Sequence, residues 1–213
     1  MIYRVVDDSR FEHPVFVPRE LDEIRLLYES RQAEKAMAAL EEQAAALPSA
    51  RAVMATLYLT GNLDLPINRE RAAELCLGDA KAGYPYAQYI LAWVSAEQGH
   101  PVQAANWMRQ AAQAGFPPAM YDMGRFYLNG IGVAKDRSLG VSWFRRATKT
   151  GHLIALRGLL QQYRAGWFGN LRKLVASILW PLSGPALYLY WRLNGPNTDK
   201  YFFYDWPNVG RKK

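Results

Sequence analysis

The chain has 213 residues, of which 50% are hydrophobic and 21% are charged, with a formal net charge of +7. That composition predicts a folded globular protein and excludes wholesale disorder. The single cysteine, Cys76, excludes an intramolecular disulfide and a multi-cysteine metal site, and His13, His100 and His152 form no metal-spaced pair. The sequence has no nucleophile elbow, phosphate loop or dinucleotide fingerprint. We therefore expect no catalytic residue, no metal, no cofactor and no small-molecule substrate.

The positive charge is concentrated in the C-terminal half. Residues 1–47 carry 6 basic and 10 acidic side chains, whereas residues 119–213 carry 15 basic and 4 acidic side chains. Between Asp136 and Asp199 there are nine Lys or Arg residues and no acidic residue. This asymmetry indicates an anionic partner, which could be lipid head groups, nucleic acid or an acidic protein surface. A solvated basic surface is the plainer alternative.

The N-terminal part of the chain is predicted to contain an extended arm and a helix pair. Residues 1–18 form the arm, which has two acidic residues by position 8 and no apolar stretch of signal-peptide length. We therefore expect no cleaved signal peptide and a cytoplasmic protein, with the cytoplasmic face of a membrane as a candidate location. Residues 19–48 are predicted to form the helix pair, which is either a cap or a degenerate repeat.

Residues 49–170 repeat a two-helix unit. Similar segments begin at Ala50, Ala87, Ala119 and Ala155, spaced 37, 32 and 36 residues apart. In each first helix, apolar and small residues recur at near-helical spacing, which predicts one buried stripe. The second helices are predicted to end at glycines in the left-handed conformation, namely Gly83, Gly115 and Gly151.

The third unit has the most specific pattern. Its glycine-rich connection runs from Asn129 to Asp136, and Asp136 is predicted to cap the helix that starts at Arg137. The unit resembles a Sel1-like repeat, whose pattern it matches at Ala119, Gly124, Tyr127, Gly130, Gly132, Val133, Asp136, Trp143, Ala147, Gly151 and Ala155. The resemblance covers roughly residues 50–166. It implies an all-α, right-handed superhelix of stacked helix pairs, that is, a tetratricopeptide-like α-solenoid.

The resemblance also implies a role. Proteins similar to Sel1-like repeats are mostly adaptors and scaffolds, so we expect a non-catalytic interaction protein with a protein partner in its concave groove. The residues expected to project into that groove are Tyr121, Asp122, Arg125 and Asn129. Further candidate partner-binding residues are the cations Arg145, Arg146, Arg157 and Arg164.

Two other functions are weaker interpretations of the sequence. Some cysteine-rich relatives of this repeat family bind or hydrolyse β-lactams, but they carry a cysteine pair in each repeat, which the lone Cys76 does not match. Nucleic acid is not the expected partner, because basic charge alone supplies only nonspecific attraction and no recognised reading module is present.

Residues 171–213 depart from the repeat. The segment Leu174–Trp191 contains 18 residues without a charge. Because Pro181, Gly184 and Pro185 should break a helix there, we expect two short apolar arms joined by a turn, lying at a membrane. The candidate membrane-docking residues are the flanking cations and the aromatic residues Arg172, Lys173, Trp180, Tyr190, Trp191 and Arg192. The alternative is that this segment is a buried cap of the solenoid.

Overall fold

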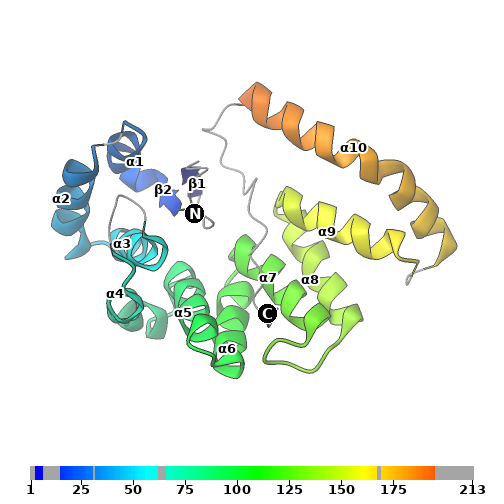
Figure 1. Cartoon of the computed structure of the whole chain (residues 1–213), viewed down its shortest axis with the longest axis horizontal. Helices are drawn as coiled ribbons and strands as arrows, with labels where there is room; N and C mark the ends of the chain where they lie inside the picture. The colour runs from blue at the N-terminus through cyan, green and yellow to red at the C-terminus, as the bar shows by residue number, and fades with distance from the viewer. Residues whose placement is uncertain (1–2, 7–14, 31, 62–65, 167–168, 195–213) are drawn as a thin grey trace.

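The structure is a computed structural model that describes residues 3–6, 15–30, 32–61, 66–166 and 169–194. Helices dominate the described part, and consecutive helices pack against each other along the chain. They follow an arc from α1 to α10, with the two short strands on its inner side (Figure 1). The predicted α-solenoid of stacked helix pairs is confirmed.

The helices of the repeat region are nearly uniform in length. Each helix from α3 to α8 has 13 residues. The helices of the described chain are α1 (Asp22–Glu29), α2 (Ala33–Ala44), α3 (Pro48–Thr60), α4 (Arg69–Lys81), α5 (Pro85–Glu97), α6 (Pro101–Gln113), α7 (Pro117–Asn129), α8 (Arg137–Lys149), α9 (Leu153–Arg164) and α10 (Asn170–Asn194). A short 3-10 turn (Arg19–Leu21) precedes α1.

Proline, glycine and polar caps set the helix boundaries. Proline occupies the first turn of α3, α5, α6 and α7, where a missing N–H costs no helical hydrogen bond. Gly83, Gly115 and Gly151 have φ values of 93°, 93° and 88°, which confirms the predicted left-handed helix ends. The predicted cap is also present, because the Asp136 carboxylate accepts a hydrogen bond of 2.9 Å from the Leu139 N–H.

Small residues let the two helices of the third repeat approach closely. A Cβ atom on Gly124 of α7 would lie 2.6 Å from the Phe144 ring and 2.9 Å from the Gly140 carbonyl oxygen of α8. A Cβ atom on Gly140 would lie 2.9 Å from the Gly124 carbonyl oxygen. The two glycines therefore form a backbone-to-backbone crossing that no larger residue could make without displacing a helix.

The described residues at the start of the chain include two short strands. Strand β1 (Tyr3–Val6) pairs antiparallel with β2 (Val15–Pro18), with Tyr3 opposite Pro18 and Val6 opposite Val15. Strand β2 lies beside α3 and α1. This ladder was not predicted from the sequence, because strand pairing depends on contacts between segments that local patterning does not encode.

The C-terminal segment differs from the prediction. Residues Asn170–Asn194 form one continuous helix, so the expected turn at Pro181, Gly184 and Pro185 is wrong. The two prolines leave the carbonyls of Ser177 and Pro181 without a helical N–H donor. Both of these residues are exposed, so water can hydrogen-bond to the carbonyls and the helix continues.

Candidate functional site

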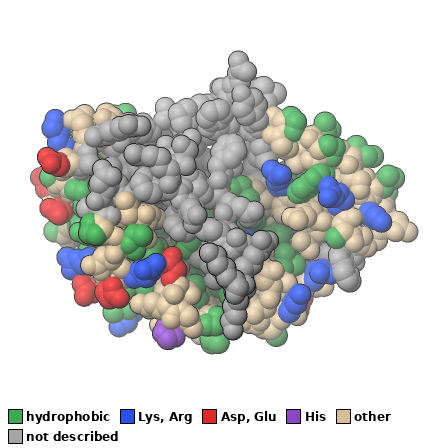
Figure 2. All heavy atoms as spheres, in the orientation of Figure 1, with side chains coloured by type: hydrophobic (Ala, Val, Ile, Leu, Met, Phe, Trp, Pro, Cys, Tyr) green, Lys and Arg blue, Asp and Glu red, His purple; other side chains and the backbone are tan. Residues whose placement is uncertain are grey.

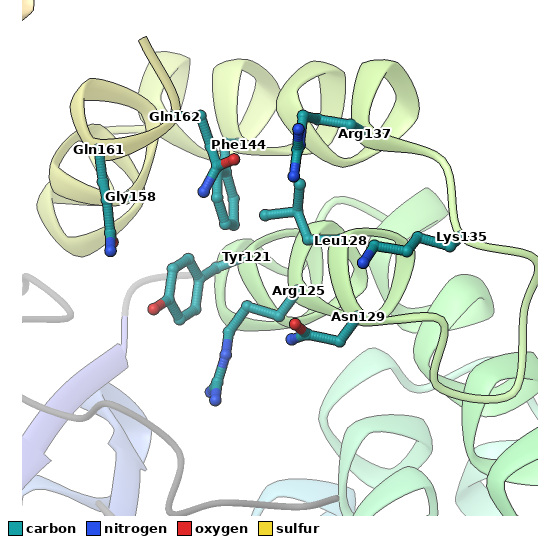
Figure 3. A pocket seen from close by; sticks show the side chains of 10 residues that line it. All are labelled: Tyr121, Arg125, Leu128, Asn129, Lys135, Arg137, Phe144, Gly158, Gln161 and Gln162. Atoms are coloured by element: carbon teal, nitrogen blue, oxygen red, sulfur yellow. The ribbon is translucent and has the colours of Figure 1, made fainter. Parts of the chain in front are cut away.

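The third repeat and the helix that follows it enclose a polar pocket. The pocket has a volume of about 320 Å³ and lies among α7, α8, α9 and the loop before α8 (Figure 3). It is lined by Tyr121, Arg125, Leu128, Asn129, Lys135, Arg137, Phe144, Gly158, Gln161 and Gln162. The lining therefore combines cations, side-chain amides and two aromatic rings.

Arg125 is held in this pocket by a network that joins two repeats. The Tyr89 hydroxyl of α5 donates a hydrogen bond of 3.0 Å to the Asp122 carboxylate of α7. The other carboxylate oxygen of Asp122 lies 3.5 Å from the Arg125 guanidinium. Burial raises the pKa of Tyr89 well above its ordinary value, and the nearby Asp122 charge adds to the shift. Tyr89 therefore acts as a neutral donor that fixes Asp122.

Tyr121 forms one wall of the pocket within an aromatic stack. Its ring lies 5.3 Å from the Phe144 ring at an interplanar angle of 20°, and 5.3 Å from the His152 ring at 22°. His152 is buried and caps α9, because its Nδ1 accepts a hydrogen bond of 3.1 Å from the Ala155 N–H. Burial lowers the pKa of His152 to about 3, so the imidazole is neutral at physiological pH.

The loop before α8 places the other two cations. A Cβ atom on Gly132, whose φ is +62°, would lie 1.8 Å from the Pro101 carbonyl oxygen, so the loop is clamped against α6. Its far end is tied by a hydrogen bond of 2.9 Å from the Asp136 N–H to the Tyr127 carbonyl. Lys135 and Arg137 therefore flank a fixed segment and face the pocket from its α8 side.

The structure separates the predicted partner-binding residues into two groups. Tyr121, Arg125 and Asn129 line the pocket, whereas Asp122, which was expected to project into the groove, is only 4% exposed and supports Arg125 from beneath. The sequence analysis missed the pocket residues Lys135, Arg137, Gly158, Gln161 and Gln162. The glycine-rich loop could have pointed to Lys135 and Arg137. The packing of α9 beside the pocket could not be predicted from local sequence patterns.

The remaining predicted cations surround aromatic rings at the C-terminal end. The guanidinium carbons of Arg157 and Arg164 on α9 lie 5.1 and 4.9 Å from the Trp180 ring centroid of α10. Arg145 donates a hydrogen bond of 2.8 Å to the Tyr163 hydroxyl, and Arg172 lies 5.5 Å from the Tyr163 ring. Such contacts stabilise by roughly 0.5–1 kcal/mol each at exposed positions. The contacts of Arg157, Arg164 and Arg172 attach α10 to α9, whereas the Arg145–Tyr163 bond joins α8 to α9.

A matching contact lies on α8. The Arg146 guanidinium carbon is 4.2 Å from the Trp143 ring centroid, on the same helix. The backbone of Tyr190, Trp191 and Arg192 belongs to α10, but their side chains lie outside the described residues. Of the predicted membrane-docking side chains, the structure thus places Arg172, Lys173 and Trp180.

The outward face of α10 carries an exposed apolar stripe. We define the stripe as Leu171, Leu174, Val175, Ile178, Leu179 and Leu182, whose exposed fractions range from 44% to 75%. The spacing of these residues places them on one side of the helix. Ala176 is buried and Trp180 is half-buried on the side that faces α9. Figure 2 shows hydrophobic side chains along the edge that α10 occupies, at the upper right, with Lys and Arg side chains beside them.

Helix α10 packs on α9 with its inner face, while the stripe on its outer face is exposed. Among the helices of the described residues, none is long and apolar enough to cross a membrane. A helix with one apolar face that is packed on its other face can instead bind in the plane of an interface.

Cys76 is buried, and burial raises the pKa of its thiol above the ordinary value, so the reactive thiolate is suppressed. No group of three or more His, Cys, Asp or Glu side chains is placed to hold a metal ion within the described part of the chain.

Comparison with known proteins identifies the repeat. The Sel1 repeat matches residues 48–77, 85–116 and 117–152. A Sel1 repeat protein from Oxalobacter formigenes is similar in structure, with 26% identity, a TM-score of 0.60 and coverage of 79% of this chain and 74% of that chain. A comparison with curated protein sequences finds no match.

Two further solved structures share the fold at lower identity. A protective antigen of uropathogenic Escherichia coli with an SLR fold has 19% identity and a TM-score of 0.59, covering 85% of this chain and 46% of that chain. A Pseudomonas aeruginosa protein has 20% identity and a TM-score of 0.56, covering 92% and 78%. The repeat matches and the helix-pair geometry agree that this chain contains three Sel1 repeats, and these structures share its fold.

Proposed function

We propose that this protein is a non-catalytic interaction scaffold that docks on an anionic membrane surface through α10. Sel1 repeats generally mediate protein–protein interaction, and the inner face of the repeats is the surface for a protein partner. The observation that carries the membrane part of the proposal is the exposed apolar stripe of α10, which lies beside a cationic region without acidic residues between Asp136 and Asp199.

The stripe supports an in-plane orientation. Its six side chains share one face, so they can enter the head-group region together while the opposite face stays packed on α9. Arg172 and Lys173 are exposed near the start of α10, and Arg157 and Arg164 are exposed on α9. Each cation near an anionic leaflet contributes roughly 1 kcal/mol. The cytoplasmic leaflet carries such lipids, which is consistent with a cytoplasmic location.

A membrane fits the stripe better than an acidic protein surface does. An acidic protein would pair with the cations but would leave six apolar side chains to be covered by a separate apolar patch. An anionic bilayer offers charge and an apolar layer together, at a separation that long Lys and Arg side chains can bridge.

Vesicle flotation tests the proposal. The full chain is mixed with vesicles of neutral lipid or of neutral lipid plus 30% anionic lipid, and the fraction that floats is measured. We expect binding to the anionic vesicles, weaker binding at high salt, and about 30-fold weaker binding in the double variant Leu174→Gln/Ile178→Gln, because about 2 kcal/mol of apolar burial is lost.

A matched control keeps the interpretation specific. Leu77→Gln/Val102→Gln removes two other exposed apolar side chains, one on α4 and one on α6. This variant should float like the unaltered chain. The membrane proposal fails if the full chain binds neither kind of vesicle, or if the two double variants bind equally. In that case the stripe would be covered by another protein or by a second copy of this chain. Sedimentation velocity would detect the second copy.

A further inference from the structure

We propose that the paired helices α9 and α10 bind a lipid headgroup that ends in a phosphomonoester, through Arg157 and Arg164 beside Trp180. The inference rests on the proposed function, because it takes α10 to lie on an anionic membrane. It adds the chemical class of lipid that this surface selects.

Two arginine side chains of α9 converge on the same ring of α10. The guanidinium carbons of Arg157 and Arg164 lie 5.1 and 4.9 Å from the Trp180 ring centroid, so their separation is at most the sum of these two distances. The two arginines are about two helical turns apart, on one face of α9. Both are exposed, so one small anion beside the ring can contact both guanidinium groups after minor side-chain rotation.

Neither guanidinium group is paired with a carboxylate. Within the described part of the chain, the side chains of Arg157 and Arg164 form no hydrogen bond and no ion pair, and they contact the Trp180 ring instead. Each arginine of α3 and α4, by contrast, has a carboxylate partner. These ion pairs are Arg51–Asp79, Arg69–Glu97 and Arg71–Glu74. The two arginines of α9 thus keep their charge and their N–H donors available for an anion.

The donor groups suit a phosphomonoester better than a phosphodiester. A guanidinium group presents several N–H donors in a planar fork that matches phosphate oxygens, and it can do so while it lies against an aromatic ring. A phosphomonoester has three acceptor oxygens and carries about −1.5 to −2 charges at pH 7, so it can engage both arginines. A phosphodiester has fewer free oxygens and a single negative charge, so it satisfies fewer of the donors.

Lys173 adds a further cation on the same side of α10. It precedes Trp180 by about two helical turns, so the two side chains project from one side of the helix. The Lys173 Cδ and Nζ atoms lie 3.4 and 4.0 Å from the position that a Cβ atom on Gly166 would occupy. Because Gly166 follows closely after Arg164, the ammonium group borders the C-terminal end of α9. The exposed lysine therefore extends the cationic site.

The position of Trp180 matches the depth of lipid phosphates. The stripe residues Ile178 and Leu182 are each two positions from Trp180, so the ring lies on the opposite side of α10. A helix is about 10–12 Å across, and the apolar face of an interfacial helix enters about 5–10 Å past the head-group boundary. The opposite side therefore lies near that boundary, where tryptophan is favoured and where lipid phosphates are found.

Flotation with charge-matched vesicles tests the inference. The full chain is mixed at neutral pH with vesicles of neutral lipid plus phosphatidate, or plus enough phosphatidylglycerol to give the same surface potential. The first lipid has a phosphomonoester headgroup and the second a phosphodiester. We expect about tenfold tighter binding to the phosphatidate vesicles, because the monoester makes additional charge-assisted contacts.

Three double variants locate this preference. Arg157→Gln/Arg164→Gln should abolish it. Arg157→Lys/Arg164→Lys keeps both charges beside Trp180 but lacks the planar fork, so it should bind both kinds of vesicle with at most about a threefold preference. The control Arg146→Gln/Lys149→Gln removes two exposed cations of α8. It should weaken binding to both kinds of vesicle and keep the tenfold preference.

The proposed function and this inference fail in different ways. If the chain floats equally well with both kinds of vesicle, or better with phosphatidylglycerol, membrane docking stands and the phosphomonoester site is overturned. The site is also overturned if the lysine variant keeps the full preference, or if the α8 control loses it as completely as the glutamine variant of α9. If the chain floats with neither kind of vesicle, the membrane role fails and this inference fails with it.

The stripe variant separates attachment from selection. Leu174→Gln/Ile178→Gln removes apolar burial and leaves the two arginines in place. It should therefore weaken binding to both kinds of vesicle by the same factor and leave the preference for phosphatidate unchanged. A loss of the preference in this variant would show that the stripe, and not the arginine pair, selects the lipid.

Discussion

The repeat stack and α10 use apolar residues in opposite ways. In α3 to α9 the apolar side chains of the first helices lie in one continuous core. On α10, a six-residue stripe of comparable side chains faces outward while Trp180 packs inward. Within the described part of the chain, apolar side chains are buried where two helices stack and exposed on the outer face of α10. The difference separates residues that specify the fold from residues that specify attachment.

The largest expected effect lies in the clamped loop of the third repeat. Gly132→Ala places a Cβ atom 1.8 Å from the Pro101 carbonyl oxygen at a φ of +62°, so we expect the free energy of unfolding to fall by about 3 kcal/mol. Gly78→Ala is the control, because nothing lies within 4 Å of its new Cβ and helix propensity favours alanine. Urea denaturation measures both. A decrease of less than 0.5 kcal/mol in the free energy of unfolding of Gly132→Ala would show that the loop can shift to make room for the new Cβ atom.

The buried His152 gives the stack a pH dependence. Its pKa is about 3 in the folded chain, and about 6.5 in an unfolded chain. The contribution of neutral His152 to the free energy of unfolding is therefore fully present above pH 6.5. It decreases as the pH falls, because the unfolded chain binds a proton that the folded chain does not. Between pH 6.5 and pH 5 the loss is about 2 kcal/mol.

Thermal denaturation at several pH values checks this slope. The variant His152→Asn keeps a residue that can cap α9 and removes the titrating group. Its stability should change less over the same pH range. An equal slope in both proteins would show that other groups cause the pH dependence.

Removing Trp180 should loosen α10 without unfolding the repeats. Trp180→Ala removes the ring that Arg157 and Arg164 contact, with an expected cost of about 1–2 kcal/mol to the attachment of α10. Hydrogen exchange should accelerate in α10 and stay unchanged in α3 to α6. Leu174→Ala, on the exposed stripe of the same helix, should leave the exchange of α10 nearly unchanged. Equal acceleration of exchange in both variants would show that contacts other than those of Trp180 hold α10 against α9.

The smallest effect is expected on the solvent side of the stack. Arg71 and Glu74 form an exposed ion pair on α4, with 3.0 Å between charged atoms. Arg71→Ala should change the free energy of unfolding by less than about 0.5 kcal/mol, because solvent screens the pair. A change above 1 kcal/mol in urea denaturation would contradict this expectation.

Sequence patterning predicted the repeats well because each signal was local. The helix-ending glycines and the Asp136 cap each depend on a few neighbouring residues, and the structure contains both. The segment boundaries at residues 18, 48 and 170 remain predictions.

The pocket and α10 were harder to predict because they depend on three-dimensional context. Lys135 and Gln161 are 26 positions apart, and only the packing of α9 brings them to one pocket. The continuity of α10 depends on whether water reaches the carbonyls that Pro181 and Pro185 leave without a donor, which a proline count does not reveal.

Spin labels on α10 test the central claim most directly. Single cysteines replace Leu174, Ile178 or Leu182 on the stripe, or Gln113 on α6 as an aqueous control, and the buried Cys76 should remain unlabelled in the folded chain. With anionic vesicles, the account predicts that labels at the three stripe positions become accessible to oxygen and protected from a water-soluble nickel reagent, while the label at position 113 stays in water. If the stripe labels remain in water while vesicles are present in excess, α10 does not dock on the membrane.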